Sequence, residues 1–412
     1  MSDNTEQKSH SELLLEKWDG VLHAKGEQEI VSTHRQKVTA QLLENTQEYL
    51  AESSNVTSGV QNWDPVLIAM VRRMAPKLIA YDFLGVQPMS APTGLIFSLK
   101  ARAAQTPPNG NPQGGPEILG LDEANTAYSG RGTHAGDDPF DAAFETGFTK
   151  TTAAGEVDLW NSVGVTIDKV SITAGTRQLR ADYSIELAQD MKRVHGLDAD
   201  AELVNILSSE IIAEMNREAV RTCYSAAKLG AQFATTAGTF DLNADADGRW
   251  SVERFKGLMF AIERDANRIA IESRRGKGNF LIVSSDVASA LAMAGILDYA
   301  PALNSQVNLE VDATGATYAG NAGRYRVYID PYLGVDAYLV GYKGSSAYDA
   351  GLYFAPYVPL ELFRATDPTN FHPALGFKTR YAMAENPFVG NSTNIKANNN
   401  FYYRKAKVTN LL

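Results

Sequence analysis

The longest helical signal in the chain covers residues 198–229, where apolar residues recur at four-residue spacing along one stripe. The stripe comprises Leu203, Leu207, Ile211 and Met215. Asp198 is a favourable N-cap. A helix of about 30 residues is roughly 45 Å long, so we expect a spine that packs its stripe against a sheet. Arg217 follows Met215 by two positions, about 200° around the helix, and we expect it to be exposed or interfacial.

The first part of the chain favours two helices, within residues 11–52, separated near Gly26. Each has a narrow apolar stripe and an otherwise charged surface, which is typical of a helix that needs a partner. The alternative is a solvated amphipathic tail. A further helix is predicted from about Trp63, because Asp64 is a good N-cap and Pro65 falls at the first helical position.

Alternating apolar and polar residues predict strands at 94–101 and at 163–172. Between them, residues 105–120 contain ten Gly, Pro or Asn in sixteen positions, so this segment cannot build a packed core. The whole excursion is also too long for an ordinary connection. We therefore predict an extended hairpin arm. The alternation shifts by one position before Val170 and Ile172, which indicates a β-bulge.

From Ser251 onwards the pattern alternates between helix and strand. Helices are expected from 251 to about 274 and from Asp286 to Ala294. Strands are expected at 279–285, 324–330, 337–342, 352–358, 376–384 and 401–408. Because helices and strands segregate without regular βαβ units, the predicted fold class is α+β.

Composition and charge narrow the function. The net charge is −10, and residues 1–52 hold five Lys/Arg against ten Asp/Glu, which is half of that net charge. Proteins that bind DNA by charge are normally basic, so sequence-directed DNA binding is disfavoured. No apolar run is long enough for a transmembrane helix. The polar N-terminus and the single cysteine, Cys223, fit synthesis in the cytoplasm.

Catalytic and cofactor motifs are missing from the sequence. It has no Walker loop, HExxH motif or G-x-S-x-G motif, and we expect no cofactor. The Arg274–Lys277 cluster favours a solvated turn over a phosphate or subunit contact.

The best metal candidate is Asn243, Asp245, Asp247 and Gly248, which copies the start of a calcium loop. The twelfth position, where such loops need Glu, is Arg254, so a hydrogen-bonded turn is favoured. A hydrolase that uses the carboxylates at 241–247 is the rival function from another class. It would need a second carboxylate pair or a base facing a pocket.

A processing pattern ends the acidic segment. Leu50, Glu52 and Ser53 form Leu-x-Glu followed by a serine, directly before a polar stretch. The same Leu/Ile-x-Glu pattern also occurs at 14–16, 42–44, 121–123 and 212–214, so the pattern alone is weak.

Several long blocks of this sequence resemble the major capsid protein of T-even-type tailed bacteriophages. The blocks are residues 65–101, 183–224, 248–303, 328–332, 341–365 and 376–388. They cover most of the chain after about residue 55. The resemblance implies the Hong Kong 97-type capsid fold, with an N-terminal arm, an extended loop, a peripheral domain with a long spine helix, and an axial domain.

The resemblance also implies a division of the chain. The expected parts are an acidic scaffold-like propeptide at 1–52, an N-terminal arm at 53–82, a peripheral-domain strand at 83–104, an extended loop at 105–160, a peripheral domain with the spine helix at 161–249, an axial domain at 250–365, and returning peripheral strands at 366–412. The family's maturation protease cuts after Leu/Ile-x-Glu, so the resemblance makes Glu52–Ser53 the expected cleavage site.

The function implied by the resemblance is self-assembly into hexameric capsomers, which form an icosahedral or elongated shell around phage DNA in the virion. The implied partners are copies of the same chain, scaffold, prohead protease, vertex and portal proteins, and decoration proteins. The 105–160 region is short compared with the usual member of the family, which indicates that an inserted surface domain is missing. Whether this chain has binding sites for decoration proteins is therefore open. Vertices use either a paralogous protein or this chain. The rival with the same fold is an encapsulin-like compartment shell.

Overall fold

The structure is a computed structural model of the whole chain. It describes residues 10–23, 30, 32–53, 78–103, 115, 117–118, 126–136, 138–158, 160–246, 248, 250–299, 317–346, 348–367, 372–390 and 394–411. The helix expected from Trp63 lies outside these residues. Helices and strands are both present and largely segregate, so the predicted α+β class is confirmed.

One half of the molecule is a four-stranded sheet with strand order β1-β12-β13-β4. The strands are β1 (Gly85–Val86), β12 (Leu352–Thr366), β13 (Pro373–Glu385) and β4 (Gly175–Asp182). β1 runs parallel to β12, and the other pairs are antiparallel. This sheet joins segments from opposite ends of the sequence.

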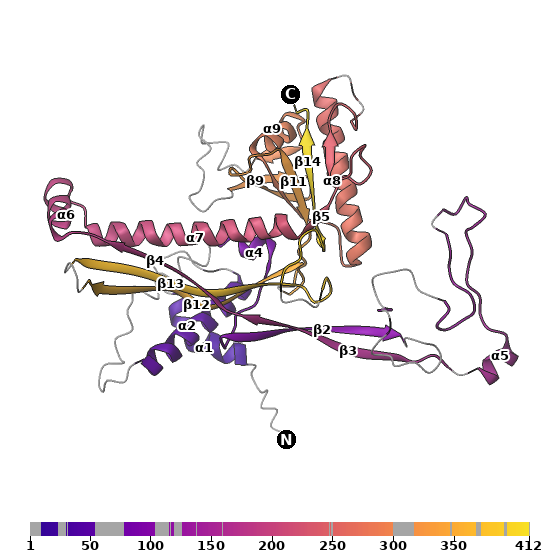
Figure 1. Cartoon of the computed structure of the whole chain (residues 1–412), viewed down its shortest axis with the longest axis horizontal. Coiled ribbons are helices and arrows are strands. Elements are labelled where there is room, and N and C mark those ends of the chain that lie inside the picture. Colours follow the sequence, from indigo (N-terminus) through magenta and orange to yellow (C-terminus); the bar gives the residue numbers. More distant parts are fainter. Residues whose placement is uncertain are drawn as a thin grey trace.

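The predicted spine is helix α7 (Ala199–Ala226), which lies along this sheet (Figure 1). The side chain of Asp198 accepts a hydrogen bond from the Asp200 amide, as expected for an N-cap. Leu207, Ile211 and Met215 are buried, so the predicted core face is confirmed. A short helix, α6 (Ile185–Asp190), and a π-helical turn (Met191–His195) precede it.

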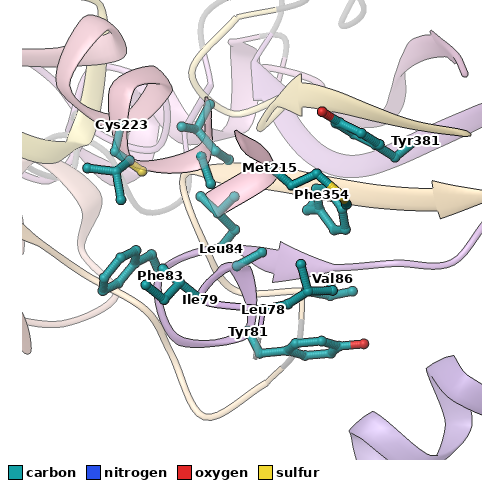
Figure 2. Packing of buried hydrophobic residues seen from close by; sticks show 14 of the residues in the cluster. Leu78, Ile79, Tyr81, Phe83, Leu84, Val86, Met215, Cys223, Phe354 and Tyr381 are labelled. Carbon is teal, nitrogen blue, oxygen red and sulfur yellow. The ribbon is translucent and has the colours of Figure 1, made fainter. Parts of the chain in front are cut away.

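The main core lies between α7, the sheet and a short segment around α4 (Ala80–Phe83). Figure 2 shows Phe83 and Leu84 on this segment, with Met215 and Phe354 beside them from α7 and β12. Phe83 also stacks on Phe280 with ring centroids 5.1 Å apart. The core is therefore continuous from the four-stranded sheet into the second half of the molecule.

The acidic N-terminal segment forms two helices, as predicted: α1 (His10–Leu22) and α2 (Thr33–Ser53). They pack on each other through a small cluster that includes Leu14, Trp18 and Leu43. They lie on the side of the sheet away from α7 (Figure 1), where α2 contacts β12. The partner of these amphipathic helices is thus the body of the same chain.

The second half of the molecule is an eight-stranded sheet with order β5-β14-β11-β7-β10-β9-β8, and β6 also pairs with β14. Its strands are β5 (Ala227–Leu229), β6 (Thr239–Asp241), β7 (Phe280–Val283), β8 (Leu297–Tyr299), β9 (Thr317–Ala322), β10 (Tyr325–Ile329), β11 (Ala337–Gly341) and β14 (Asn400–Thr409). Helices α8 (Ser251–Ser273) and α9 (Ser285–Met293) pack on it through a second apolar cluster.

The expected division of the chain between the peripheral part, which here contains the four-stranded sheet, and the axial part, which contains the eight-stranded sheet, differs from the structure in three places. β12 was expected in the axial part but belongs to the four-stranded sheet, and β14 was expected to return to that sheet but pairs with β11 in the other. The eight-stranded sheet also takes β5 and β6, which precede residue 250. Strand patterning reports the burial of a segment but not its partner, so it cannot assign a strand to one of two sheets.

The predicted hairpin arm is confirmed. β2 (Thr93–Ala103) and β3 (Val163–Thr173) form an antiparallel two-stranded ribbon that extends away from both sheets (Figure 1). The predicted bulge is wrong, because the pairing runs without a shift from Thr93↔Thr173 to Ala103↔Val163. The burial of the side chains changes along β3 instead. Val170 and Ile172 are buried against the body, whereas the apolar side chains on the outer half of the arm are exposed.

No helix in the described part of the chain combines the length and apolar character needed to cross a bilayer.

Candidate assembly surfaces

The outer face of the arm is apolar and exposed. Cross-strand neighbours Leu99 and Ile167 are 66% and 67% exposed, and Phe97 is 62% exposed. The complete set is Leu95, Phe97, Leu99, Val163, Val165 and Ile167, which we call the arm face. Contiguous apolar surface of this kind, rimmed by polar residues, marks an interaction site. The arm face therefore needs a partner that the described part of the chain does not supply.

The opposite face of the arm is the buried one. Asp168 lies 3.0 Å from both Lys100 and Arg102, and Lys100 also donates to the carbonyl of Pro387 at 2.9 Å. Lys100 is only 7% exposed. The alternation in the sequence correctly separates the two faces of β2. Hydrophobicity alone, however, would predict that the face with Leu99 is buried and the face with Lys100 is exposed, which is the reverse of the structure. Lys100 is held by its ion pair with Asp168 on the neighbouring strand of the arm and by its hydrogen bond to the Pro387 carbonyl on the body, and neither partner is visible in the local pattern of β2.

The later part of the excursion between the strands, from residue 126 to 160, contributes no core. Among its described residues from 126 to 160 none is buried, and Phe140 is 96% exposed. Phe148, Val157 and Trp160 are also exposed, around the short helix α5 (Thr152–Val157). This agrees with the expectation that the segment cannot pack by itself, and it adds a set of exposed aromatic rings beyond the arm face.

Arg217 is partly buried in an ion pair within the chain, so it is not the plain exposed site that was one of the two expectations for it. Its Nη1 lies 2.6 Å from both carboxylate oxygens of Asp330, whose side chain is 0% exposed. Asp330 follows β10, and its Oδ1 also accepts the Tyr332 amide. The guanidinium lies over the Tyr332 ring, 5.3 Å from its centroid. This ion pair ties α7 to the eight-stranded sheet.

A second arginine holds α7 to the four-stranded sheet. Arg177 on β4 donates to Glu214 at 2.5 Å and also bonds to Glu218 and the hydroxyl of Tyr381. Burial lowers the pKa of Arg177, but these hydrogen bonds raise it by more, so it stays charged. Glu214 belongs to the Leu/Ile-x-Glu copy at 212–214, which is thus fixed within a helix.

The expected processing residues Leu50, Glu52 and Ser53 form the last turn of α2. The copies at 14–16 and 42–44 lie inside α1 and α2, and the copy at 121–123 lies outside the described residues. The carbonyls of a last turn have no intrahelical partner, so a helix opens most easily at its end. Position within the helix thus distinguishes Glu52 from the other copies in described helices.

The calcium-loop candidate is a hydrogen-bonded turn, and Asp247 lies outside the described residues. Burial raises the pKa of Asp245, but hydrogen bonds from the Asp241 and Thr235 amides lower it by more. Arg254, at the position where calcium loops place Glu, donates to Asn243. Nowhere among the described residues do three or more His, Cys, Asp and Glu side chains gather to hold a metal ion. These acidic residues thus stabilise the turn.

Two remaining sequence candidates are also structural. Lys277 pairs with Glu263 at 2.8 Å and Arg275 lies 3.7 Å from Asp349, so the basic turn is engaged in contacts within the chain. Cys223 is fully buried in the main core, and burial raises the pKa of its thiol to about 12. A thiol in that environment is unreactive.

The comparisons with known proteins agree with the sequence resemblance. The family model described as major capsid protein Gp23 matches residues 60–408. The chain is 42% identical to the major capsid protein of Serratia phage KSP90, over 97% of this chain and 98% of that one. It is 34% identical to the major capsid protein of Enterobacteria phage T4, over 91% of each chain. The capsid vertex protein of Vibrio phage KVP40 is 23% identical, over 60% of this chain and 77% of its own.

Similar solved structures include the capsid of Myoviridae phage XM1, with 12% identity, a TM-score of 0.41, and coverage of 79% of this chain and 90% of that one. Three parts implied for a Hong Kong 97-type fold have counterparts in the structure: a spine helix on a sheet, an extended two-stranded arm, and a second sheet with its own helices; the expected N-terminal arm lies mostly outside the described residues. The chain therefore belongs to the family of the major capsid protein Gp23 and is a structural subunit of the tailed-phage head shell.

Proposed function

We propose that the arm face is the principal contact between neighbouring subunits in hexameric capsomers. The observation that carries this proposal is the pair of cross-strand side chains Leu99 and Ile167, both about two-thirds exposed on a ribbon that leaves the body. Burying one such side chain is worth about 1.5–3 kcal/mol. Each subunit engages several neighbours, so modest contacts sum to a stable shell.

The test is a double substitution, Leu99→Asp with Ile167→Asp, in the full chain. Because both side chains are exposed, the unassembled subunit should keep its stability while capsomer and shell formation are lost. The matched control is Thr173→Asp, an exposed position at the base of the arm, opposite Thr93 and outside the arm face. Assembly by the double variant at the level of this control would refute the proposal.

A second experiment addresses the excursion itself. Deleting residues 107–116 should leave soluble, folded subunits that assemble poorly or form fragile shells. The reason is compositional, since this Gly/Pro-rich segment cannot pack by itself. If the deletion unfolds the subunit and spares assembly, the segment contributes to the core and the assignment is wrong.

We also propose that residues 1–52 are removed between Glu52 and Ser53 when the shell matures. The proposal is supported by the charge boundary at this point and by the position of Glu52 in the final turn of α2. Intact mass of protein from finished virions should give a chain that begins at Ser53. Glu52→Gln should block processing and leave proheads assembled, whereas Glu16→Gln, in the copy within α1, should leave processing unchanged.

The proposed partners are a scaffold, a prohead protease, and vertex and portal proteins. The similarity to a capsid vertex protein supports a paralogous protein at the vertices. The alignment with the major capsid protein of Vibrio phage KVP40 runs over 512 positions, more than this chain has residues, so that relative carries segments missing here. We propose that decoration proteins, where present, do not use an inserted domain. The relatives are structural proteins, and we propose no catalytic activity for this chain.

A further inference from the structure

Helix α2 occupies a groove on the body of the chain. Its Val38 and Leu42 are buried in the main core cluster, not in the small cluster shared with α1. The groove is lined by Leu78, Tyr81, Met215, Phe354, Pro356 and Val358. The amide of Asn45 donates to the carbonyls of Met89, at 2.7 Å, and Tyr357, at 2.9 Å. The groove thus holds one face of α2 by apolar burial and two hydrogen bonds.

The N-terminal end of α2 contacts the body around Tyr81. We call the site formed by His34, Arg35, Tyr81, Asp82 and Lys343 the socket. The His34 ring lies edge-on to Tyr81, with centroids 6.3 Å apart, and its Nε2 is buried with no hydrogen-bond partner among the described residues. Arg35 lies over the same Tyr81 ring, 4.9 Å from its centroid, and 3.6 Å from Asp82. Lys343 donates from Nζ to the Tyr81 carbonyl. Three basic side chains therefore converge on one short segment of the body.

The socket is crowded with positive charge. The charged or titratable groups around it are Arg35 and Lys37 on α2, Tyr81 and Asp82 on α4, Arg326 on β10, and Lys343. Burial lowers the pKa of His34, and Lys343, Lys37 and Arg35 lower it further, against a hydrogen bond to the backbone of Val86. Burial likewise lowers the pKa of Lys343 to about 8. A further positive charge in the socket is therefore unfavourable.

We propose that α2 occupies a releasable docking site on the body of the chain, and that protonation of His34 opens the socket and releases the helix. Docked His34 is half-buried with its Nε2 enclosed, which disfavours its protonation, whereas on a released helix the ring is free to take a proton from water. Release then takes up about one proton. The open fraction should rise about tenfold for each pH unit below the ordinary histidine value of about 6.5, until docked His34 itself is protonated.

This inference goes beyond the proposed removal of residues 1–52 and does not depend on it. It concerns the uncleaved chain, in which α2 is part of the fold. It assigns a second role to the acidic segment, because a helix that leaves the groove uncovers the apolar residues that line it. The groove is thus masked while α2 is docked and accessible once it is released.

The test uses cysteine labelling of the full unassembled chain. Thr39 on α2 is 1% exposed and lines the groove, and cysteine is close to it in size. Ser289 on α9 is exposed and serves as the reference position. The labelling rate of Thr39→Cys, divided by that of Ser289→Cys at the same pH, cancels the pH dependence of the thiol chemistry. The wild-type chain is the blank, because its single cysteine, Cys223, is fully buried.

The rate ratio should rise about tenfold between pH 7.5 and pH 5.5. Adding His34→Gln to Thr39→Cys should hold the ratio within about twofold over that range. Lys343→Met removes one cation from the socket, so it should slow labelling at both pH values and keep the rise. A flat ratio in Thr39→Cys, an equal rise in the His34→Gln background, or parallel labelling of Cys223 at pH 5.5 would each overturn the proposal.

Discussion

The ion pair between Arg217 and Asp330 gives the sharpest stability prediction. Arg217→Ala would leave the Asp330 carboxylate, which is 0% exposed, without its cation, and would remove the contact with the Tyr332 ring. Removing one member of a buried ion pair typically costs about 3–5 kcal/mol, because the remaining charge stays buried and uncompensated. Arg217 itself is 24% exposed, which places the expected loss at about 3 kcal/mol. A domain is stable by only roughly 5–15 kcal/mol.

The assay is chemical denaturation of unassembled subunits, which gives the free energy of unfolding. Arg221→Ala is the matched control, since Arg221 is exposed one turn further along α7 and should change stability by less than about 0.5 kcal/mol. Arg217→Lys should fall between wild type and Arg217→Ala, because a lysine keeps the charge but not the guanidinium geometry. The free energy of unfolding of Arg217→Ala could instead stay within about 0.5 kcal/mol of the wild-type value, as that of Arg221→Ala should. In that case the Arg217–Asp330 ion pair does not stabilise the contact between α7 and the eight-stranded sheet.

Three further predictions concern the core, a buried acid and the arm. Leu207→Ala with Ile211→Ala should remove much of the subunit's stability, since each truncation of a buried side chain costs about 2–5 kcal/mol; near-neutral denaturation curves would show that the stripe is not core. Burial raises the pKa of Glu361 to about 7, so the free energy of unfolding falls as the pH rises from the ordinary glutamate pKa of 4.5 to about 7, and stays lower above it. Glu361→Gln should therefore raise the melting temperature at pH 8 by an amount that shrinks towards pH 4.5, and an equal gain at both pH values would contradict this. Phe97→Asp should leave the unfolding free energy within about 0.5 kcal/mol of wild type and reduce shell yield, as measured by sedimentation and electron microscopy.

The sequence alone determined the elements whose signals are local. The spine helix was predicted from four-residue spacing and its Asp198 cap, and α7 has that core face and that cap. The two strands of the arm were predicted from alternation and are paired as expected, whereas the Gly/Pro-rich segment at 105–120 lies almost entirely outside the described residues. The long ordered blocks carried the family resemblance, which the family model and the curated relatives confirm.

The tertiary structure decided everything that depends on a partner distant in the sequence. Lys100 is buried and Leu99 exposed because Asp168 and the Pro387 carbonyl meet the lysine, whereas no part of the described chain covers the leucine. Arg217 is part of an ion pair because Asp330, 113 residues away, lies beside it. β14 belongs to the eight-stranded sheet because it pairs in antiparallel fashion with β11, a strand that is distant in the sequence. Local patterns report how a segment alternates between water and interior, but the identity of the covering surface is set by long-range packing.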